Sequence, residues 1–154
     1  SSKARAICRW VYKNLTYTYS SSEKGALAAL NSGIGKCTDY SDLFVALCRA
    51  TGIPARLIKG QTLNHATSWG ILVQNYSGNT ASHVWAEVYL PSLGWVTLDP
   101  TFNEYPVWDG QHVAVQIGTR LSSLSGCSDY YYRYYGQTNT FTAVENYYIY
   151  PNFS

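Results

Sequence analysis

Gly52 and Pro54 divide this chain into two parts whose apolar residues repeat with different periods. Before Gly52, apolar side chains recur every three or four residues, which is the pattern of amphipathic helices. Pro54 cannot continue a helix, and the later segment 82–90 alternates between apolar and polar residues, which is the pattern of a β-strand. Helices followed by antiparallel strands are typical of the α+β class, with N-terminal helices packed on an antiparallel β-sheet.

Three segments before Pro54 have helical periodicity: 3–15, a short segment that serines 20–22 would cap and that ends near Gly33, and about 37–51. Their apolar faces comprise Ile7, Trp10, Val11 and Leu15 in the first, Ala26, Leu27 and Leu30 in the second, and Leu43, Phe44, Leu47 and Cys48 in the third. Strands are predicted at 56–59, 70–74, 82–90, 95–99, 112–117 and 141–150, and the tyrosine-rich segment 130–135 is either a strand or an aromatic loop.

Length and composition narrow the classes of function. The 154 residues suit a single domain, 1–154, with its own core. A net charge of +2 without a basic run argues against nucleic-acid binding, and no apolar stretch approaches the roughly 20 residues of a membrane span. Because the chain lacks Met and opens on two serines, we expect a mature form or an excised domain. Its many Tyr, Ser, Thr and Asn residues suggest an extracellular or cell-envelope location, and we expect a monomer.

The four cysteines do not form a disulfide scaffold pattern in a chain of this length, and the absence of a CxxC motif gives a structural zinc site little support. Cys8 and Cys48 are expected in the core, either as two free thiols or as a disulfide. Cys127 either pairs with Cys8 or is free.

Cys37 differs from the other cysteines because the glycines before it place it at the start of a helix. A helix N-terminus stabilises a thiolate through its free N–H groups and the positive end of its dipole. Cys48 lies about 16 Å further along the same helix, too far away to bond to Cys37. We therefore interpret Cys37 as a candidate nucleophile and Cys48 as a core residue.

A thiolate nucleophile needs a base and a group that orients the base, and His83 and Asp99 are the candidates. They lie on consecutive strands joined by a tight turn. If the loop has an odd length, 91–93, Trp85 opposes Asp99, and His83 and Asp99 become diagonal neighbours on one face, about 7 Å apart at Cβ. An even loop would place them on opposite faces. The catalytic interpretation therefore predicts an odd loop or a bulge.

The remaining histidines, His65 and His112, are predicted to be surface residues because each lies in or next to a polar loop or turn. Trp85 shares the predicted face of His83, so it is a candidate to screen the thiolate from water or to contact substrate. A metal site built from Cys37, His83 and Asp99 is conceivable, but these ligands lack a spacing signature, and we predict no metal site.

The segments GKCTDYSDLFVALCRATGIPAR and SHVWAEVYLPSLGWVTLDPT together resemble the transglutaminase-like superfamily of papain-type thiol enzymes. The first is similar to its nucleophile segment and the second to its His strand, hairpin and Asp-Pro strand, in the family's order. The resemblance extends over about residues 4–126. It implies that Cys37 is the nucleophile, His83 the base and Asp99 the orienting group.

The implied chemistry is acyl transfer through a thioester, with the Cys37 N–H as one oxyanion donor. Tyr17 and Tyr19 are candidates for the second donor or for substrate binding, on position alone. This chemistry requires no cofactor, although stimulation by a divalent cation stays open. The chain is more similar to small microbial members than to large animal transglutaminases.

Three functions are compatible with these residues. The first is a cysteine-dependent hydrolase of amide or isopeptide bonds in a peptide or cell-wall polymer, as in the endoisopeptidases that cut pseudomurein. The second is a transamidase that forms crosslinks, since the triad does not distinguish water from an amine as acceptor. The third is a non-catalytic binding module, which the presence of all three triad residues disfavours.

Overall fold

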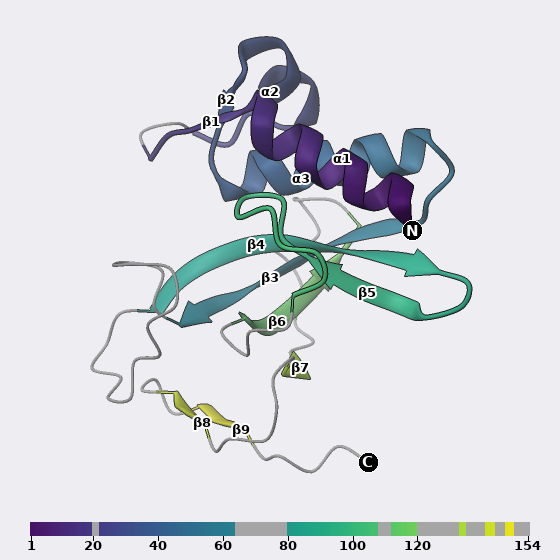
Figure 1. Ribbon diagram of the computed structural model, residues 1–154. Helices are drawn as coiled ribbons and strands as arrows, with labels where there is room; N and C mark the ends of the chain where they lie inside the picture. The colour runs from purple at the N-terminus through teal and green to yellow at the C-terminus, as the bar shows by residue number, and fades with distance from the viewer. Residues whose placement is uncertain are drawn as a thin grey trace.

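The structure is a computed structural model that describes residues 1–19, 22–63, 80–107, 112–119, 133–134, 141–143 and 147–149. Within these ranges, three helices lie on one side of an antiparallel sheet (Figure 1). The α+β class predicted from the sequence is therefore confirmed. The strand predicted at 70–74, His65 and Cys127 lie outside the described residues.

The helices are α1 (Ser2–Asn14), α2 (Ala26–Ser32) and α3 (Cys37–Ala50). The main sheet has the order β5-β4-β3-β6-β7 and comprises β3 (Ala55–Leu63), β4 (Thr80–Leu90), β5 (Gly94–Leu98), β6 (His112–Gly118) and β7 (Arg133–Tyr134). Two small pairs lie outside it: β1 (Thr16–Tyr17) with β2 (Ile34–Gly35), and β8 (Phe141–Ala143) with β9 (Tyr147–Ile149). The single strand predicted at 141–150 is therefore two short strands, which an alternating pattern alone does not distinguish.

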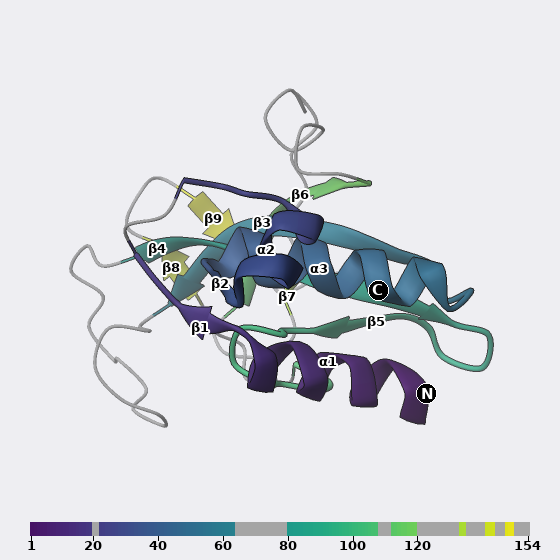
Figure 2. The same cartoon turned by 90° about the horizontal axis from the view of Figure 1, so that it is seen from above.

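The main core lies between the helices and the sheet. Seen from above, α3 crosses the middle of the sheet, and α1 runs beside α3 (Figure 2). The core combines small and branched residues from both layers, among them Ala4, Cys8, Val11, Phe44, Cys48, Leu57, Ala86, Val88 and Leu98. No helix among the described residues is both long and apolar enough to cross a bilayer.

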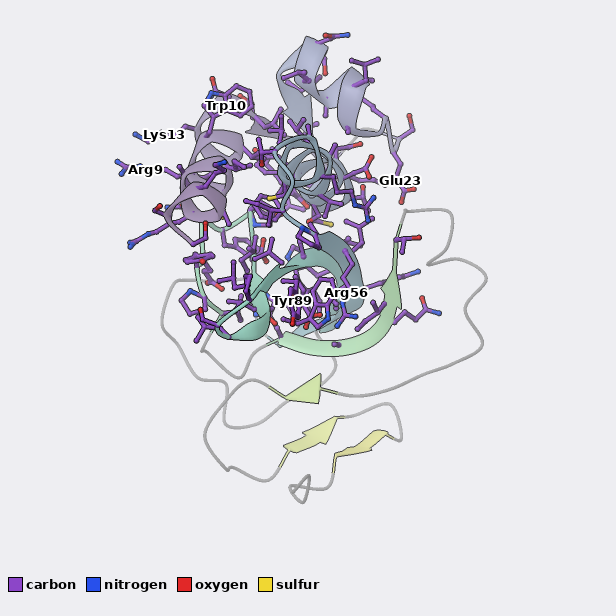
Figure 3. All side chains as sticks on the ribbon, turned by 90° about the vertical axis from the view of Figure 1, so that its right-hand side faces the viewer. Arg9, Trp10, Lys13, Glu23, Arg56 and Tyr89 are labelled. Atoms are coloured by element: carbon purple, nitrogen blue, oxygen red, sulfur yellow. The ribbon has the colours of Figure 1, made fainter. Side chains whose placement is uncertain are left out.

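Helix α1 corrects one residue of the predicted apolar face. Its buried residues are Ala4, Cys8 and Val11, whereas Trp10 is 42% exposed and points away from the sheet with Arg9 and Lys13 (Figure 3). Each residue step turns the helix by about 100°, so Trp10 cannot share a narrow stripe with its neighbour Val11.

Helix α2 is held at its N-terminus by α3, and the predicted serine cap at 20–22 is wrong. Its N-cap is Gly25, with a φ of 80°, and no side chain of its own caps it. The carboxylate of Asp42 accepts a hydrogen bond from the Ala26 N–H at 2.8 Å, and Asp39 accepts from Gly25 at 3.0 Å. The cap therefore comes from a neighbouring helix. Of the residues predicted on the apolar face, Leu27 and Leu30 are exposed, whereas Ala29 is the buried residue of this helix.

Helix α3 begins at Cys37, as predicted, because the chain before it folds against its first turn. Asp39 Oδ2 accepts the Lys36 N–H at 3.0 Å and closes a capping box. A Cβ at Gly35 would lie 2.6 Å from the Asp39 Cβ, so only glycine permits this approach. The geometry of this turn holds Cys37 at the first helical position.

Candidate active site

The β4–β5 hairpin has the odd loop that the catalytic interpretation predicted. Ala86 pairs with Leu98 and Leu90 pairs with Gly94, which leaves the three-residue loop 91–93. His83 and Asp99 consequently share a face, and His83 Nε2 lies 2.6 Å from Asp99 Oδ2. Both side chains are buried. The predicted contact between these two residues is confirmed.

The edge of β4 becomes free at Val84, next to His83. Continuing the β4–β5 register by two residues from Ala86 and Leu98 would pair Val84 with Pro100. Pro100 has no N–H to donate to a strand ladder, so it cannot complete this pair. Asp99 instead forms an isolated bridge with Glu104. The backbone groups of Val84 are therefore available to another element.

Helix α3 occupies this free edge with its first turn. The buried Ser41 hydroxyl donates to the Val84 carbonyl at 2.8 Å, and the Val84 N–H donates to the Cys37 sulfur. Cys37 and Ser41 are four residues apart and so lie one above the other on the helix. These two contacts set the N-terminus of α3 against β4 and bring the thiol to His83.

Cys37 and His83 shift each other's pKa in opposite directions. Burial by itself raises the pKa of Cys37, but the hydrogen bond and charge of His83 outweigh it, so the pKa falls below its ordinary 9.0. Burial lowers the pKa of His83, but the Asp99 carboxylate and then Cys37 outweigh it, so the pKa rises above its ordinary 6.5. Both shifts favour a thiolate–imidazolium pair.

The ring nitrogens of His83 have separate partners. Because Nε2 faces the Asp99 carboxylate, it carries a proton, which leaves Nδ1 to exchange a proton with the Cys37 thiol. Burial raises the pKa of Asp99, but the charge of His83 and hydrogen bonds from two histidines outweigh it, so the pKa lies below its ordinary range. Asp99 is therefore a carboxylate throughout the neutral range.

His112 is the second of these histidines, and its predicted surface position is wrong. It is fully buried, and its Nε2 lies 3.0 Å from the same Asp99 Oδ2. The ligand atoms of His83, Asp99 and His112 all lie within 4.8 Å of one another, so these three residues form the cluster with metal-ligand chemistry in the described part of the chain. The alternation of β6, with His112 and Ala114 both buried, was the available sequence signal.

Trp85 forms a wall beneath the two histidines. Its fully buried indole stacks on His83, with ring centroids 5.9 Å apart, and meets His112 edge-on at 5.0 Å. Phe102 packs on His83 from another direction at 5.1 Å. Such packing restricts rotation of the His83 ring. A direct contact between Trp85 and substrate stays a prediction that this burial does not favour.

Tyr17 lies at the exposed side of Cys37. Its hydroxyl is within hydrogen-bonding reach of both the Cys37 N–H and the Cys37 thiol. Burial, followed by the charge of Cys37, raises the pKa of Tyr17 to about 12, so the phenol keeps its proton. The two-residue pairing of β1 with β2 brings Tyr17 opposite Gly35, two residues before Cys37. Tyr19 is 92% exposed and contacts the Tyr17 ring.

The other described cysteines, Cys8 and Cys48, are free thiols in the main core. Burial is the largest cause that raises the pKa of each to about 12. The alternative of a Cys8–Cys48 disulfide is therefore not what the structure contains. Neither thiol is poised to act as a nucleophile.

Comparison with known families agrees with this geometry. Residues 1–100 match the family model of the transglutaminase-like superfamily. The chain belongs to this superfamily.

One curated relative of this chain is an uncharacterised protein of Haemophilus influenzae, which is 37% identical over 114 residues. The matched segment is 63% of this chain and 30% of that protein. A protein-glutamine gamma-glutamyltransferase of Pseudomonas aeruginosa is 35% identical over 75 residues, which are 47% of this chain and 10% of that protein. The chain thus spans only a minor part of the length of these relatives.

Among solved structures, a candidate cysteine protease from Cytophaga hutchinsonii superimposes with a TM-score of 0.66 and 23% identity, over 92% of this chain and 47% of that one. At this identity the likeness concerns the fold alone. It supports the arrangement of helices on an antiparallel sheet that the described residues adopt.

Proposed function

We propose that this protein is a thiol enzyme that cleaves amide or isopeptide bonds through a thioester on Cys37. One observation carries the proposal: the Cys37 thiol starts a helix and faces His83, whose other ring nitrogen is 2.6 Å from the buried Asp99. A nucleophile, a base and an orienting carboxylate in this order form the arrangement of nucleophilic acyl transfer.

In the first half of the proposed reaction, the Cys37 sulfur attacks the carbonyl carbon of the amide, and the carbonyl oxygen becomes an oxyanion. When this intermediate collapses, the C–N bond breaks, and His83 gives its Nδ1 proton to the leaving amine. In the second half, water loses a proton to His83 and attacks the thioester. The products are a carboxylic acid and the restored thiol.

The oxyanion would bind to the Cys37 N–H and to the hydroxyl of Tyr17. The N–H at the first helical position has no intrahelical acceptor, and in the resting site it is within reach of the Tyr17 oxygen. Because the pKa of Tyr17 is raised to about 12, this phenol remains a donor. We prefer Tyr17 to Tyr19 because the almost fully exposed Tyr19 contacts Tyr17 instead of Cys37.

The acceptor of the acyl group distinguishes two functions. Hydrolysis is our first proposal, with a peptide or cell-wall polymer as substrate, and a wall-lytic endoisopeptidase such as one acting on pseudomurein is its most specific form. Transamidation is the second candidate, and the 35% identity to a protein-glutamine gamma-glutamyltransferase supports it. An extracellular or envelope location, a monomeric state and independence of a cofactor belong to the same proposal.

The decisive experiment uses peptides that carry glutamine carboxamides or amide-linked lysine side chains, with and without a fluorescent primary amine. Mass spectrometry of the products distinguishes the outcomes. Free carboxylate and released amine support hydrolysis, whereas incorporation of the fluorescent amine supports transamidation. A thioester adduct on Cys37 would be trapped by acid quenching in either case.

Cys37→Ala removes the nucleophile, and Cys48→Ala is its matched control in the same helix. We expect no turnover from the first variant and full turnover from the second. Turnover that survives in Cys37→Ala would contradict the mechanism. If no peptide or wall fragment reacts with the wild-type chain, the third alternative, a binding module, gains support.

A further inference from the structure

The Asp99 carboxylate has every acceptor position occupied. Its Oδ1 accepts the backbone N–H of Thr101 at 2.7 Å and that of Phe102 at 3.4 Å. Its Oδ2 lies 2.6 Å from His83 Nε2 and 3.0 Å from His112 Nε2. The contacts with Thr101, His83 and His112 are buried and that with Phe102 is partly buried, and an unpaired charge in such a place would be costly. The orienting interaction of the proposed triad is therefore shared between two histidines.

The approach of His112 to Asp99 is not a consequence of adjacent strands. Asp99 follows β5, His112 begins β6, and β4 and β3 lie between them in the sheet order. In a flat sheet this separation would be about 14 Å, at roughly 4.8 Å per strand. A register shift between Lys59 and Gly60 in β3 marks a bulge, and bulges bend a sheet. The curvature of the sheet thus brings His112 to the active site.

Both histidines must carry a proton on Nε2, because each of these nitrogens faces the same carboxylate oxygen. A bound cation would arrange the atoms differently. Nitrogen and oxygen ligands about 2 Å from a tetrahedral zinc are separated from each other by about 3.3 Å. The 2.6 Å between His83 Nε2 and Asp99 Oδ2 is shorter than this and matches a charge-assisted hydrogen bond.

We propose that His112 is a positioning residue that acts on His83 through Asp99. The His112 N–H holds the Asp99 oxygen in line with His83 Nε2. It also stabilises part of the negative charge of this carboxylate, which weakens the interaction of Asp99 with His83. Without His112, the carboxylate would interact with His83 alone and would hold the imidazolium more strongly. His83 would then become a weaker acid toward the leaving group. The consequence for turnover depends on the proposed function, whereas the consequence for His83 itself does not.

Other titratable groups around Asp99 do not supply this effect. The Cys8 thiol of α1 approaches the Asp99 backbone carbonyl at 3.8 Å and stays neutral, since its pKa is raised to about 12. The Glu87 carboxylate of β4 is paired with Arg56 at 2.6 Å. Cys37 of α3 and His83 of β4 also interact with Asp99, and Glu104, after β5, pairs with the Asp99 backbone.

The test uses ¹⁵N-histidine-labelled chain and two variants. His112→Gln keeps an N–H donor near the position of Nε2, and His112→Leu removes it. NMR gives the tautomer and the titration of each ring. We expect the Nε2 of His112 to carry a proton in the wild type. We expect the His83 titration to move up by about one pH unit in His112→Leu, a tenfold change in its proton affinity, and to stay in place in His112→Gln.

Ile117→Ala is the matched control, because Ile117 packs in the same strand and in the apolar cluster of Trp85 without contacting Asp99. A His83 titration in His112→Leu that equals those of the wild type and of Ile117→Ala would overturn the proposal. So would a wild-type His112 with its proton on Nδ1, a measurement that needs no variant to fold. A stoichiometric bound metal that His112→Gln loses would also overturn it.

Once a substrate has been found, kcat and KM are measured for the wild type and for the two His112 variants. His112→Leu should lower kcat up to about tenfold with KM unchanged, and His112→Gln should restore it. If the chain processes no substrate, the proposed function fails, yet the NMR titration still decides the role of His112. The two proposals therefore fail through different measurements.

Discussion

At Cys37 two opposing effects act on the thiol. Burial raises its pKa, and the charged and hydrogen-bonding groups of His83 lower it by more, whereas Cys48 in the same helix experiences burial alone and its pKa rises to about 12. Two cysteines eleven residues apart on one helix thus differ because only one of them faces an imidazole. The position at the first turn determines this difference.

The first prediction concerns alkylation of Cys37 by iodoacetamide as a function of pH. Because the thiolate reacts and its pKa is lowered, the rate should rise through an inflection below 9.0. In His83→Ala the inflection should move up toward 9.0 or above, since burial and the charge of Asp99, which both raise the pKa, are then opposed only by the hydrogen bond from the Val84 N–H. Peptide mass mapping separates Cys37 from Cys8 and Cys48, which should stay unlabelled. Equal inflections in the two proteins would show that His83 does not stabilise the thiolate.

The second prediction concerns Tyr17, whose hydroxyl reaches the Cys37 N–H. Tyr17→Phe should lower kcat about a hundredfold and leave KM nearly unchanged, because an oxyanion donor acts mainly in the transition state. Tyr19→Phe, which alters an exposed neighbour, should retain wild-type kcat. A loss confined to KM would indicate that Tyr17 binds substrate without contributing to oxyanion stabilisation.

At the scale of elements, the junction between α3 and β4 positions Cys37 against His83. Pro100 prevents the β4–β5 ladder from reaching Val84, and α3 takes up the released backbone groups through Cys37 and Ser41. The same sequence feature that ends the β4–β5 ladder therefore leaves the edge of β4 against which α3 packs.

The third prediction tests this junction with Ser41→Ala. The change leaves the buried Val84 carbonyl without its donor, which should lower the free energy of unfolding by about 1–3 kcal/mol. Turnover should fall as well, because Cys37 then loses its register with His83. Ser32→Ala, which removes an exposed hydrogen bond at 3.3 Å, is the control and should have little effect. Urea unfolding of both variants measures the difference, and equal stabilities would contradict the docking role.

At the scale of the whole molecule, the sheet has two differently occupied faces. One face packs on the helices and forms the main core, and the other carries the histidines, Asp99 and Trp85. Curvature of the sheet gathers residues from β4, β6 and the end of β5 at one place. The buried charges of the candidate active site therefore also contribute to the free energy of unfolding.

The fourth prediction is the dependence of stability on pH. The lowered pKa of Asp99 contributes stability that is present above 3.8 and is lost as the pH falls further. The raised pKa of His83 contributes stability that is complete below 6.5 and is lost as the pH rises through the folded-state value. The free energy of unfolding should thus be greatest between these limits, as measured by urea unfolding over a pH series.

Asp99→Asn should weaken both the loss of stability at acidic pH and the loss at high pH, since it removes the charge with which His83 pairs. Glu23→Gln, a change at an exposed carboxylate, should leave the profile in place. If Asp99→Asn keeps the wild-type dependence, other groups account for it.

The sequence by itself determined the structural features that depend on residues close together in the chain. The change of period at Gly52 and Pro54 predicted the α+β class, and the turn before Cys37 predicted its place at a helix start. Parity in the 91–93 loop predicted that His83 and Asp99 share a face, because side chains alternate along strands with a period of two. Each of these inferences involves residues within one element or one hairpin.

The tertiary structure alone decided the features that depend on contacts between distant segments. The position of Tyr17 depends on a two-residue strand pair, and the cap of α2 comes from Asp42 on another helix. His112 meets Asp99 only because the sheet curves across two intervening strands. Local periodicity indicates which face of a strand His112 occupies, but it contains no measure of how far a sheet bends, so only the tertiary structure showed that His112 contacts Asp99.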